Sequence, residues 1–192
     1  MPFPPIPIQN SVPGVKTIDH NNFCLLNSPI FNEAIPDSIK KIKETINLLC
    51  ERIKALDAHT GLFLLSHYCS APRLNYLMRS SPTFYQSPSL IEIDNIVREA
   101  ATAVTNVTIE KNGWRQASLP TRFGGLGIRR VETLALPCYI SSLTKSLDLI
   151  RQILPQAIPP KPSQLTHAER VFSIRHPGAK LPAGDSAERQ RA

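Results

Sequence analysis

The densest group of residues with binding chemistry is the stretch LPTRFGGLGIRR at residues 119–130. Three glycines, Gly124, Gly125 and Gly127, fall within four residues, and two arginines follow. A glycine-rich loop that leads into a helix can hold phosphate, because the first backbone N–H groups of a helix lack intrahelical partners. Glycines also permit positive φ and a close backbone approach in a tight turn. The pattern favours the turn over an anion site.

The two common nucleotide-binding motifs do not fit this loop. GGLG is not G-x-G-x-x-G, and the preceding Leu119-Pro120 is not a buried strand. No acidic residue stands about 20 residues downstream in a βαβ frame, and no G-K-[ST] follows as it does in a P-loop. We therefore expect no nucleotide cofactor here.

A second pattern is a set of cations interleaved with aromatic residues. It suits nucleic acid, because arginine holds phosphate while aromatic rings stack on bases. The aromatic members are Tyr76, Trp114 and Phe123. A core role for Trp114 and Phe123, with arginines at the rim, fits the pattern equally well. The predicted nucleic-acid-binding residues are Arg73, Arg79, Arg115, Arg122, Arg129 and Arg130, and Lys111 lies among them.

Residues suited to catalysis or metal binding are scattered. His59 and His67 would lie two helical turns apart, too far to share a metal ion, and no further ligand near Cys69 completes a site. Ser66 and His67 are adjacent, so a helix would point them in different directions. The aspartates stand singly, with no Asp-Asp pair for metal-dependent polymerase or nuclease chemistry. We expect no catalytic centre, no metal site and no cofactor.

The charge of the 192-residue chain is uneven. Residues 1–109 carry nine Lys/Arg and nine Asp/Glu, whereas residues 110–192 carry 13 basic and six acidic residues and so the whole net charge of +7. Such an excess suits DNA, RNA or a hybrid duplex, and equally a solvated basic surface. No apolar run reaches the roughly 20 residues of a membrane span, and MPFPPIPIQ lacks the features of a signal peptide. We expect a nuclear or cytoplasmic protein without a membrane partner.

Helical periodicity dominates the middle of the chain, while its 18 prolines gather toward the ends. Ile39, Ile42 and Ile46 begin an apolar stripe at helical spacing, with Asp37 as the expected N-cap. Asp57 is the expected N-cap of a second helix, whose LFLL centre should be buried. The predicted helices cover 37–56, 58–70, 73–79, 90–106, 130–154 with an interruption or restart near Pro137, and a short piece at 166–174.

These elements predict a mostly α fold, a bundle of about five to six helices. An extended proline-rich N-terminal segment precedes the bundle, and a disordered basic C-terminal tail follows it. The apolar runs 23–26 and 29–31 look strand-like but have no clear partner in the chain. The four cysteines are too far apart in sequence for a metal knuckle, so we expect them to act as small buried hydrophobes.

Several segments together resemble one protein family. They are CLLNSPIF at 24–31, the pattern LDAH…FLL…PRLNYL within 48–82, and the LPTRFGGLGIRR block within 114–143. In this order and spacing they are similar to the region downstream of the catalytic palm in reverse transcriptases of non-LTR retrotransposons, and in host genes derived from them. Asn27 departs from the family, which usually has glycine there.

The resemblance implies three parts. Residues 1–36 would be an extended remnant of the palm, residues 37–154 a helical thumb-like domain that grips a template–primer duplex, and residues 155–192 a proline-rich and basic flexible tail. The palm aspartates, including the aromatic-x-Asp-Asp motif, would lie upstream of Met1. The chain would then be a catalytically inactive fragment of an RNA-directed DNA polymerase with weak, sequence-independent nucleic-acid binding. The alternative is a vestigial or domesticated helical module that binds a protein partner and no nucleic acid.

Overall fold

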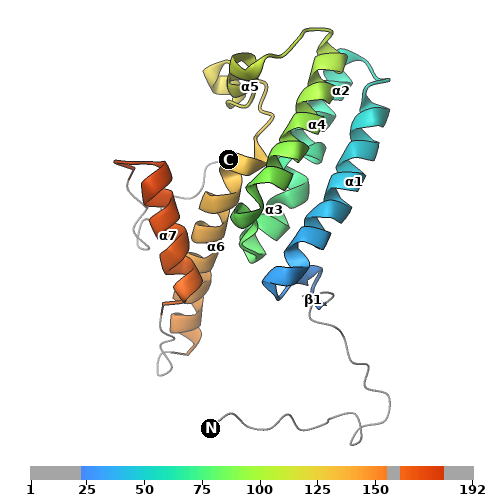
Figure 1. Ribbon diagram of the computed structural model, residues 1–192. Coiled ribbons are helices and arrows are strands. Elements are labelled where there is room, and N and C mark those ends of the chain that lie inside the picture. The colour runs from blue at the N-terminus through green and yellow to red at the C-terminus, as the bar shows by residue number, and fades with distance from the viewer. Residues whose placement is uncertain (1–22, 155–160, 180–192) are drawn as a thin grey trace, which may run out of the picture.

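The computed structural model describes residues 23–154 and 161–179, and most of these residues are helical. Three long helices organise them: α1 (Ile35–Ile53), α4 (Ser87–Thr105) and α6 (Val131–Ile153). α4 packs against α1 on one side and against α6 on the other (Figure 1). The predicted mostly α fold class is confirmed. None of the described helices combines the length and the apolar character needed to cross a membrane.

Shorter elements connect and cover the long helices. They are the 3-10 turn η3 (Asn32–Ala34), α2 (Ala58–Leu64), the π-helix η4 (Leu65–Cys69), α3 (Ala71–Ser80), the 3-10 turn η5 (Thr83–Gln86), α5 (Lys111–Ala117), the 3-10 turn η6 (Thr121–Phe123) and α7 (Ser163–Arg175). α3 packs along α6, and α7 covers the opposite side of α6 (Figure 1). α5 lies apart, at the upper end of the bundle in this view.

The first helix buries the predicted apolar stripe but starts earlier than predicted. Ile39 and Ile46 are at most 1% exposed, and burial of each such side chain is worth about 1.5–3 kcal/mol. The N-cap position is Ala34, which makes no side-chain cap, and Asp37 lies inside the first turn. The prediction of Asp37 as N-cap is wrong, because Pro36 is tolerated in the first turn of a helix and does not stop it.

The second helix begins at the predicted cap. The Asp57 carboxylate accepts a hydrogen bond from the backbone N–H of Thr60 at 3.0 Å, and this bond lowers the pKa of Asp57. α2 then continues into the π-helix η4 instead of remaining α-helical to residue 70. Phe63 in the LFLL centre is 53% exposed, so the prediction of a buried centre fails there, although Leu65 is fully buried.

The N-terminal apolar runs pair with each other, which corrects the prediction that they lack a partner. β1 (Cys24–Leu25) runs antiparallel to β2 (Ser28–Pro29). The two residues between them, Leu26 and Asn27, have φ of +50° and +64°. This left-handed conformation is the one that glycine adopts freely and asparagine tolerates. The turn therefore accommodates Asn27 where the resembling family usually has glycine.

The C-terminal third is more ordered than predicted. α6 runs without interruption from Val131 to Ile153 and contains Pro137. α7 contains the short helix predicted at 166–174, and it packs on α6 and buries Leu165 and Ala168 at no more than 2% exposure. This part of residues 155–192 is therefore not the flexible tail that was predicted. Residues 155–160 and 180–192 of that predicted tail, and most of the predicted N-terminal segment, lie outside the described residues.

The cysteines do not share one environment. Cys50 and Cys69 are buried, as predicted, while Cys138 is half-buried. Cys24 is exposed because the hairpin that carries it lies at the surface. All four thiols are free. A hydrogen bond with Cys69, followed by burial, raises the pKa of the Cys50 thiol.

Candidate nucleic-acid interface

The glycine-rich loop is a turn that folds back on α5. The N–H of Gly127 donates to the carbonyl of Leu119 at 3.0 Å, which closes the loop. Gly124 and Gly127 have φ of +76° and +72°, a region that residues with a Cβ rarely adopt. At Gly125 a Cβ would lie 2.0 Å from the Leu119 carbonyl oxygen. Each glycine thus has a backbone reason to be there, as the turn interpretation requires.

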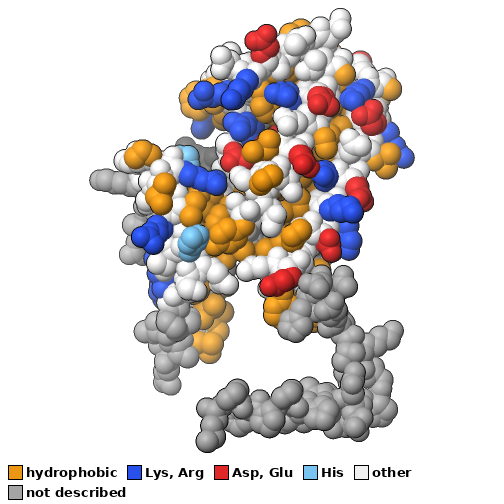
Figure 2. All heavy atoms as spheres, viewed as in Figure 1, with side chains coloured by type: hydrophobic (Ala, Val, Ile, Leu, Met, Phe, Trp, Pro, Cys, Tyr) orange, Lys and Arg blue, Asp and Glu red, His pale blue; other side chains and the backbone are white. Residues whose placement is uncertain are grey.

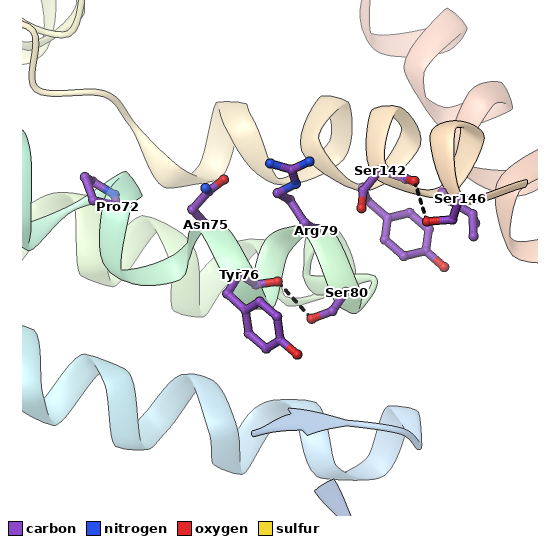
Figure 3. A pocket seen from close by; sticks show the side chains of 9 residues that line it. Pro72, Asn75, Tyr76, Arg79, Ser80, Ser142 and Ser146 are labelled. Atoms are coloured by element: carbon purple, nitrogen blue, oxygen red, sulfur yellow. Dashed lines mark hydrogen bonds between the residues drawn. The ribbon is translucent and has the colours of Figure 1, made fainter. Parts of the chain in front are cut away.

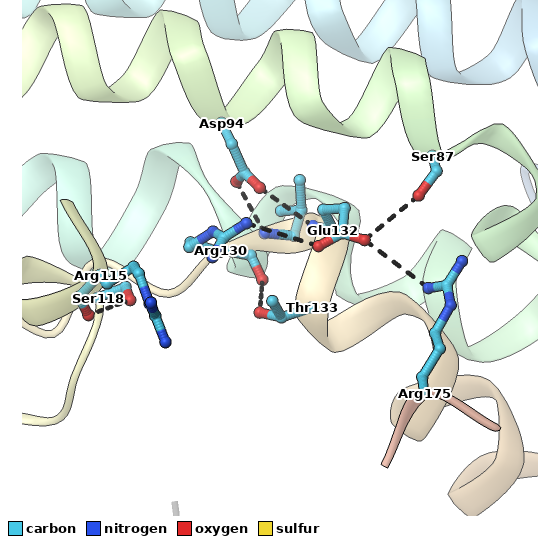
Figure 4. A network of polar contacts seen from close by, with 9 residues as sticks. Ser87, Asp94, Arg115, Ser118, Arg130, Glu132, Thr133 and Arg175 are labelled. Carbon is cyan, nitrogen blue, oxygen red and sulfur yellow. Dashed lines mark hydrogen bonds and ion pairs between the residues drawn. The ribbon is translucent and has the colours of Figure 1, made fainter. Parts of the chain in front are cut away.

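The helix N-terminus that follows the loop is already occupied by a carboxylate of the chain. Asp94, on α4, accepts hydrogen bonds from the backbone N–H of Val131 at 2.8 Å and of Glu132 at 3.2 Å (Figure 4). Asp94 is 3% exposed. Burial raises its pKa to about 6, although these two bonds and nearby Arg130 act in the opposite direction. An external phosphate has no access to these N–H groups while Asp94 holds them.

Arg130 belongs to the same polar network. Its guanidinium lies 3.6 Å from the Glu132 carboxylate, and Glu132 also pairs with Arg175 of α7 at 3.7 Å. The hydroxyl of Ser87 donates to the same carboxylate at 3.3 Å (Figure 4). The charge of Arg130 is therefore engaged inside the protein, in contrast to the other predicted arginines.

The five other predicted arginines are exposed. Within residues 23–154 and 161–179, none of them takes part in an ion pair. Arg122 lies over the ring of Phe123, with its guanidinium carbon 4.9 Å from the ring centre. Exposed and uncompensated guanidinium groups are suited to phosphate. They are Arg73, Arg79, Arg115, Arg122 and Arg129.

Three of these arginines lie along α3 and the start of α6. The hydroxyl of Ser70, just before α3, donates to the carbonyl of Arg129 at 2.6 Å, so the first turn of α3, with Arg73, lies near Arg129. Burial raises the pKa of the Cys138 thiol, and the positive charges of Arg79 and Arg129 both oppose that rise. The packing of α3 on α6 has thus assembled cations that are far apart in sequence.

The remaining two arginines lie at the α5 end of the molecule. Arg115 is on α5 and Arg122 is on η6, which follows it. Figure 2 shows Lys and Arg side chains gathered over α5. Residues 110–130 contain five basic residues and one acidic residue, which explains the local excess.

The aromatic residues of the pattern divide between core and surface. Trp114 is 5% exposed and belongs to the hydrophobic core, so the core interpretation holds for it. Phe123 is 63% exposed and Tyr76 is 51% exposed. These two rings remain accessible for stacking.

Ser66 and His67 contact each other, contrary to the prediction. The Ser66 hydroxyl lies 2.7 Å from Nδ1 of His67, because both groups turn back to the carbonyl of Phe63, each at 3.0 Å. The local pattern missed this contact because these residues lie in the π-helix η4, where backbone hydrogen bonds span five residues. Among the described residues, no acidic side chain contacts His67, and no three His, Cys, Asp or Glu side chains gather to hold a metal ion.

Comparison with known proteins adds no assignment. No protein-family model, no curated protein and no solved structure matches this chain. The reverse-transcriptase resemblance therefore stays a prediction based on the segments quoted above. The geometry of the exposed arginines is the ground for a functional proposal.

Proposed function

We propose that this chain binds nucleic-acid duplex, without sequence preference, through Arg73, Arg115, Arg122 and Arg129. The role is binding rather than catalysis, and DNA, RNA and hybrid duplexes are all candidate partners. Arg79 is separate from this set because it lines a gap between two packed helices.

One observation carries the proposal: these four guanidinium groups are exposed and make no ion pair within the described part of the chain. The lysines and arginines that do form ion pairs there are Lys43, Lys54, Arg130, Arg151, Lys161 and Arg175, and of these Arg130 is next to Arg129 in sequence. Guanidinium groups left uncompensated at the surface attract phosphate and release its condensed counterions. This yields affinity without reading the bases.

The resemblance supports the same proposal. A thumb region of a reverse transcriptase is helical and grips a duplex by its backbone, and the described chain is helical with a basic end. On this view the chain is a non-LTR reverse-transcriptase thumb, or a host protein derived from one, that acts in the nucleus or cytoplasm. The glycine-rich loop then serves to fold η6, with Arg122, back against α5.

The test is fluorescence anisotropy of short dye-labelled duplexes, with the double variant Arg115→Ala/Arg122→Ala. We expect wild-type binding at about 50 mM salt that weakens steeply as salt rises, because phosphate contacts release counterions. The double variant should bind about tenfold more weakly and show a salt slope shallower by about two. Circular dichroism and Trp114 emission should show that it is folded.

The matched control is Arg52→Ala. Arg52 is exposed near the end of α1 and makes no ion pair within the described chain, but it lies outside the four-arginine set. It should bind as the wild type does. Absence of duplex binding at about 50 mM salt, where phosphate contacts are strong, would overturn the proposal, as would equal losses in the control and the double variant.

A protein-interaction role is the second candidate, and one observation favours it. The last turns of α6 expose Leu149, Ile150, Ile153 and Leu154, with exposed fractions of 56%, 38%, 65% and 54%. Contiguous exposed apolar side chains mark interaction surfaces. Light scattering after size-exclusion chromatography tests this candidate: self-association or partner binding that Leu149→Ser/Ile153→Ser abolishes would support it.

A further inference from the structure

A groove runs between α3 and α6. Its volume is about 540 Å³, within the range of sites that hold small molecules. Figure 3 shows Asn75 and Arg79 projecting from α3 toward α6, and Ser142 and Ser146 on α6 farther along, beyond Arg79. Leu143 and the ring of Tyr139 supply apolar wall. The groove therefore combines one cation and several neutral polar groups with apolar walls, and it lies between two helices that pack closely.

The charge of this groove is suited to an anion. Arg79 is the one charged residue that lines it, and no carboxylate does. A second groove, of about 450 Å³ between α1 and α4, has the opposite character. It is lined by Glu44, Glu92 and Glu99, and its cation, Lys43, is paired with Glu92 at 2.7 Å. Of these two grooves, only the one between α3 and α6 is free of repulsion toward phosphate.

Three hydrogen-bond donors in the α3–α6 groove remain available. Among the described residues, the Arg79 guanidinium, the Asn75 amide and the Ser142 hydroxyl make no hydrogen bond with another side chain or the backbone. The Ser146 hydroxyl, in contrast, donates to the Ser142 carbonyl at 2.9 Å. A guanidinium flanked by neutral donors is the arrangement that binds a phosphate diester.

An aromatic ring stands at the edge of the same groove. Tyr76 lines it and is 51% exposed, and in Figure 3 its ring points away from α6. It lies one turn of α3 before Ser80 and Arg79. A ring beside a phosphate-binding arginine offers a surface on which a base can stack, provided that the base is not paired.

We propose that the α3–α6 groove binds one unpaired nucleotide of a single nucleic-acid strand. Its phosphate lies on Arg79, Asn75 and Ser142, and its base stacks on Tyr76. The choice of nucleic acid as ligand rests on the proposed function, but the site does not: duplex is held by the four other arginines. A chain with both sites would bind the junction of a duplex and its single-stranded extension.

The experiment measures anisotropy of dye-labelled oligothymidylate and, separately, of a dye-labelled duplex. We expect Arg79→Ala and Tyr76→Ala each to weaken oligothymidylate binding about tenfold and to leave duplex binding unchanged. Tyr76→Phe keeps the ring and should bind as the wild type does. Arg52→Ala is the matched control for the loss of an exposed arginine, and circular dichroism verifies that each variant is folded.

The outcomes separate this proposal from the proposed function. Oligothymidylate binding that depends on Arg79 and Tyr76 supports the groove even if duplex does not bind, and in that case the proposed function alone fails. Absence of oligothymidylate binding, or binding that neither variant changes, overturns the groove site. If the two variants lose affinity for oligothymidylate and for duplex alike, the groove site is also overturned, because the groove would then be part of a duplex-binding surface.

Discussion

Asp94 accepts a hydrogen bond from the backbone N–H of Val131 at 2.8 Å, across 37 residues of sequence. Through this bond α4 supplies the N-terminal cap of α6, whose own N-cap residue, Arg130, makes no side-chain cap. The bond also fixes the end of the glycine-rich loop and the position at which Arg129 leaves it. The placement of Arg129 and Arg130, just before α6, therefore depends on a carboxylate of another helix.

Replacing Asp94 should destabilise the fold. Asp94→Ala leaves the N–H groups of Val131 and Glu132 without a partner in a buried place, and we expect a loss of about 2 kcal/mol in the free energy of unfolding. Urea denaturation followed by circular dichroism measures it. Asp57→Ala is the comparison, because Asp57 caps a helix at an exposed position and its removal should cost less. An equal or larger loss for Asp57→Ala would contradict this account of Asp94.

Asp94 should also give stability a pH dependence of unusual sign. Its pKa is about 6 in the folded chain, against an ordinary value of 3.8. The folded chain then binds a proton more tightly than the unfolded chain, so the contribution of this carboxyl is greatest below pH 3.8, falls as pH rises toward about 6 and is constant above that. Asp57, with a lowered pKa, acts in the opposite direction.

The difference in unfolding free energy between the wild type and Asp94→Asn isolates this contribution. Asparagine keeps an oxygen acceptor for the α6 N–H groups and does not titrate. As pH rises from 3.8 to about 6, the unfolding free energy of the wild type should fall relative to that of Asp94→Asn. A difference that stays constant over the interval would show that the pKa of Asp94 is not raised.

The two neighbouring glycines should tolerate alanine very differently. In Gly125→Ala the new Cβ would meet backbone oxygens of Leu119 and Gln116 at 2.0 and 2.7 Å, so the turn must open, at a cost of about 3 kcal/mol. In Gly124→Ala the Cβ enters open space and only the positive φ is unfavourable, which costs about 1 kcal/mol. Emission of Trp114, buried on α5, reports unfolding of this region. Equal losses would refute the close-approach argument.

The sequence predicted those features that depend on neighbours along the chain. Helical periodicity located the long helices, and Asp57 was identified as a cap because its partner, Thr60, is three residues away. The turn role of the glycines also follows from local conformation. Asp37 was wrongly predicted as the N-cap because a proline in the first turn is compatible with a helix that starts earlier.

The features that escaped prediction depend on tertiary packing. Asp94 looks like any polar residue of an amphipathic helix, and its role becomes visible only when α4 meets α6. Six arginines looked equivalent, yet Arg130 is the one that faces Glu132. The π-helix that brings Ser66 to His67 has no simple local pattern. The predicted arginines could therefore be divided into paired and unpaired ones only once the structure had shown their ion pairs.

The ion pair between Glu132 and Arg130 should restrain nucleic-acid binding. Glu132→Gln keeps an oxygen that can accept from Ser87 but removes the charge that holds Arg130 and Arg175. The released arginines can then reach phosphate, so duplex affinity should rise about threefold and the salt slope should steepen by up to about 0.9 for each new phosphate contact. Anisotropy titrations at several salt concentrations measure both quantities.

The control for this prediction is Glu169→Gln, which removes the same charge from an ion pair with Lys161 on the α7 side. If both variants strengthen binding equally, net charge alone is responsible and Arg130 has no special position. If Glu132→Gln weakens binding, the network instead holds Arg129 and Arg130, just before α6, in place for phosphate. If only Glu132→Gln raises the affinity for duplex, the polar network around Asp94 determines how many arginines can contact the duplex.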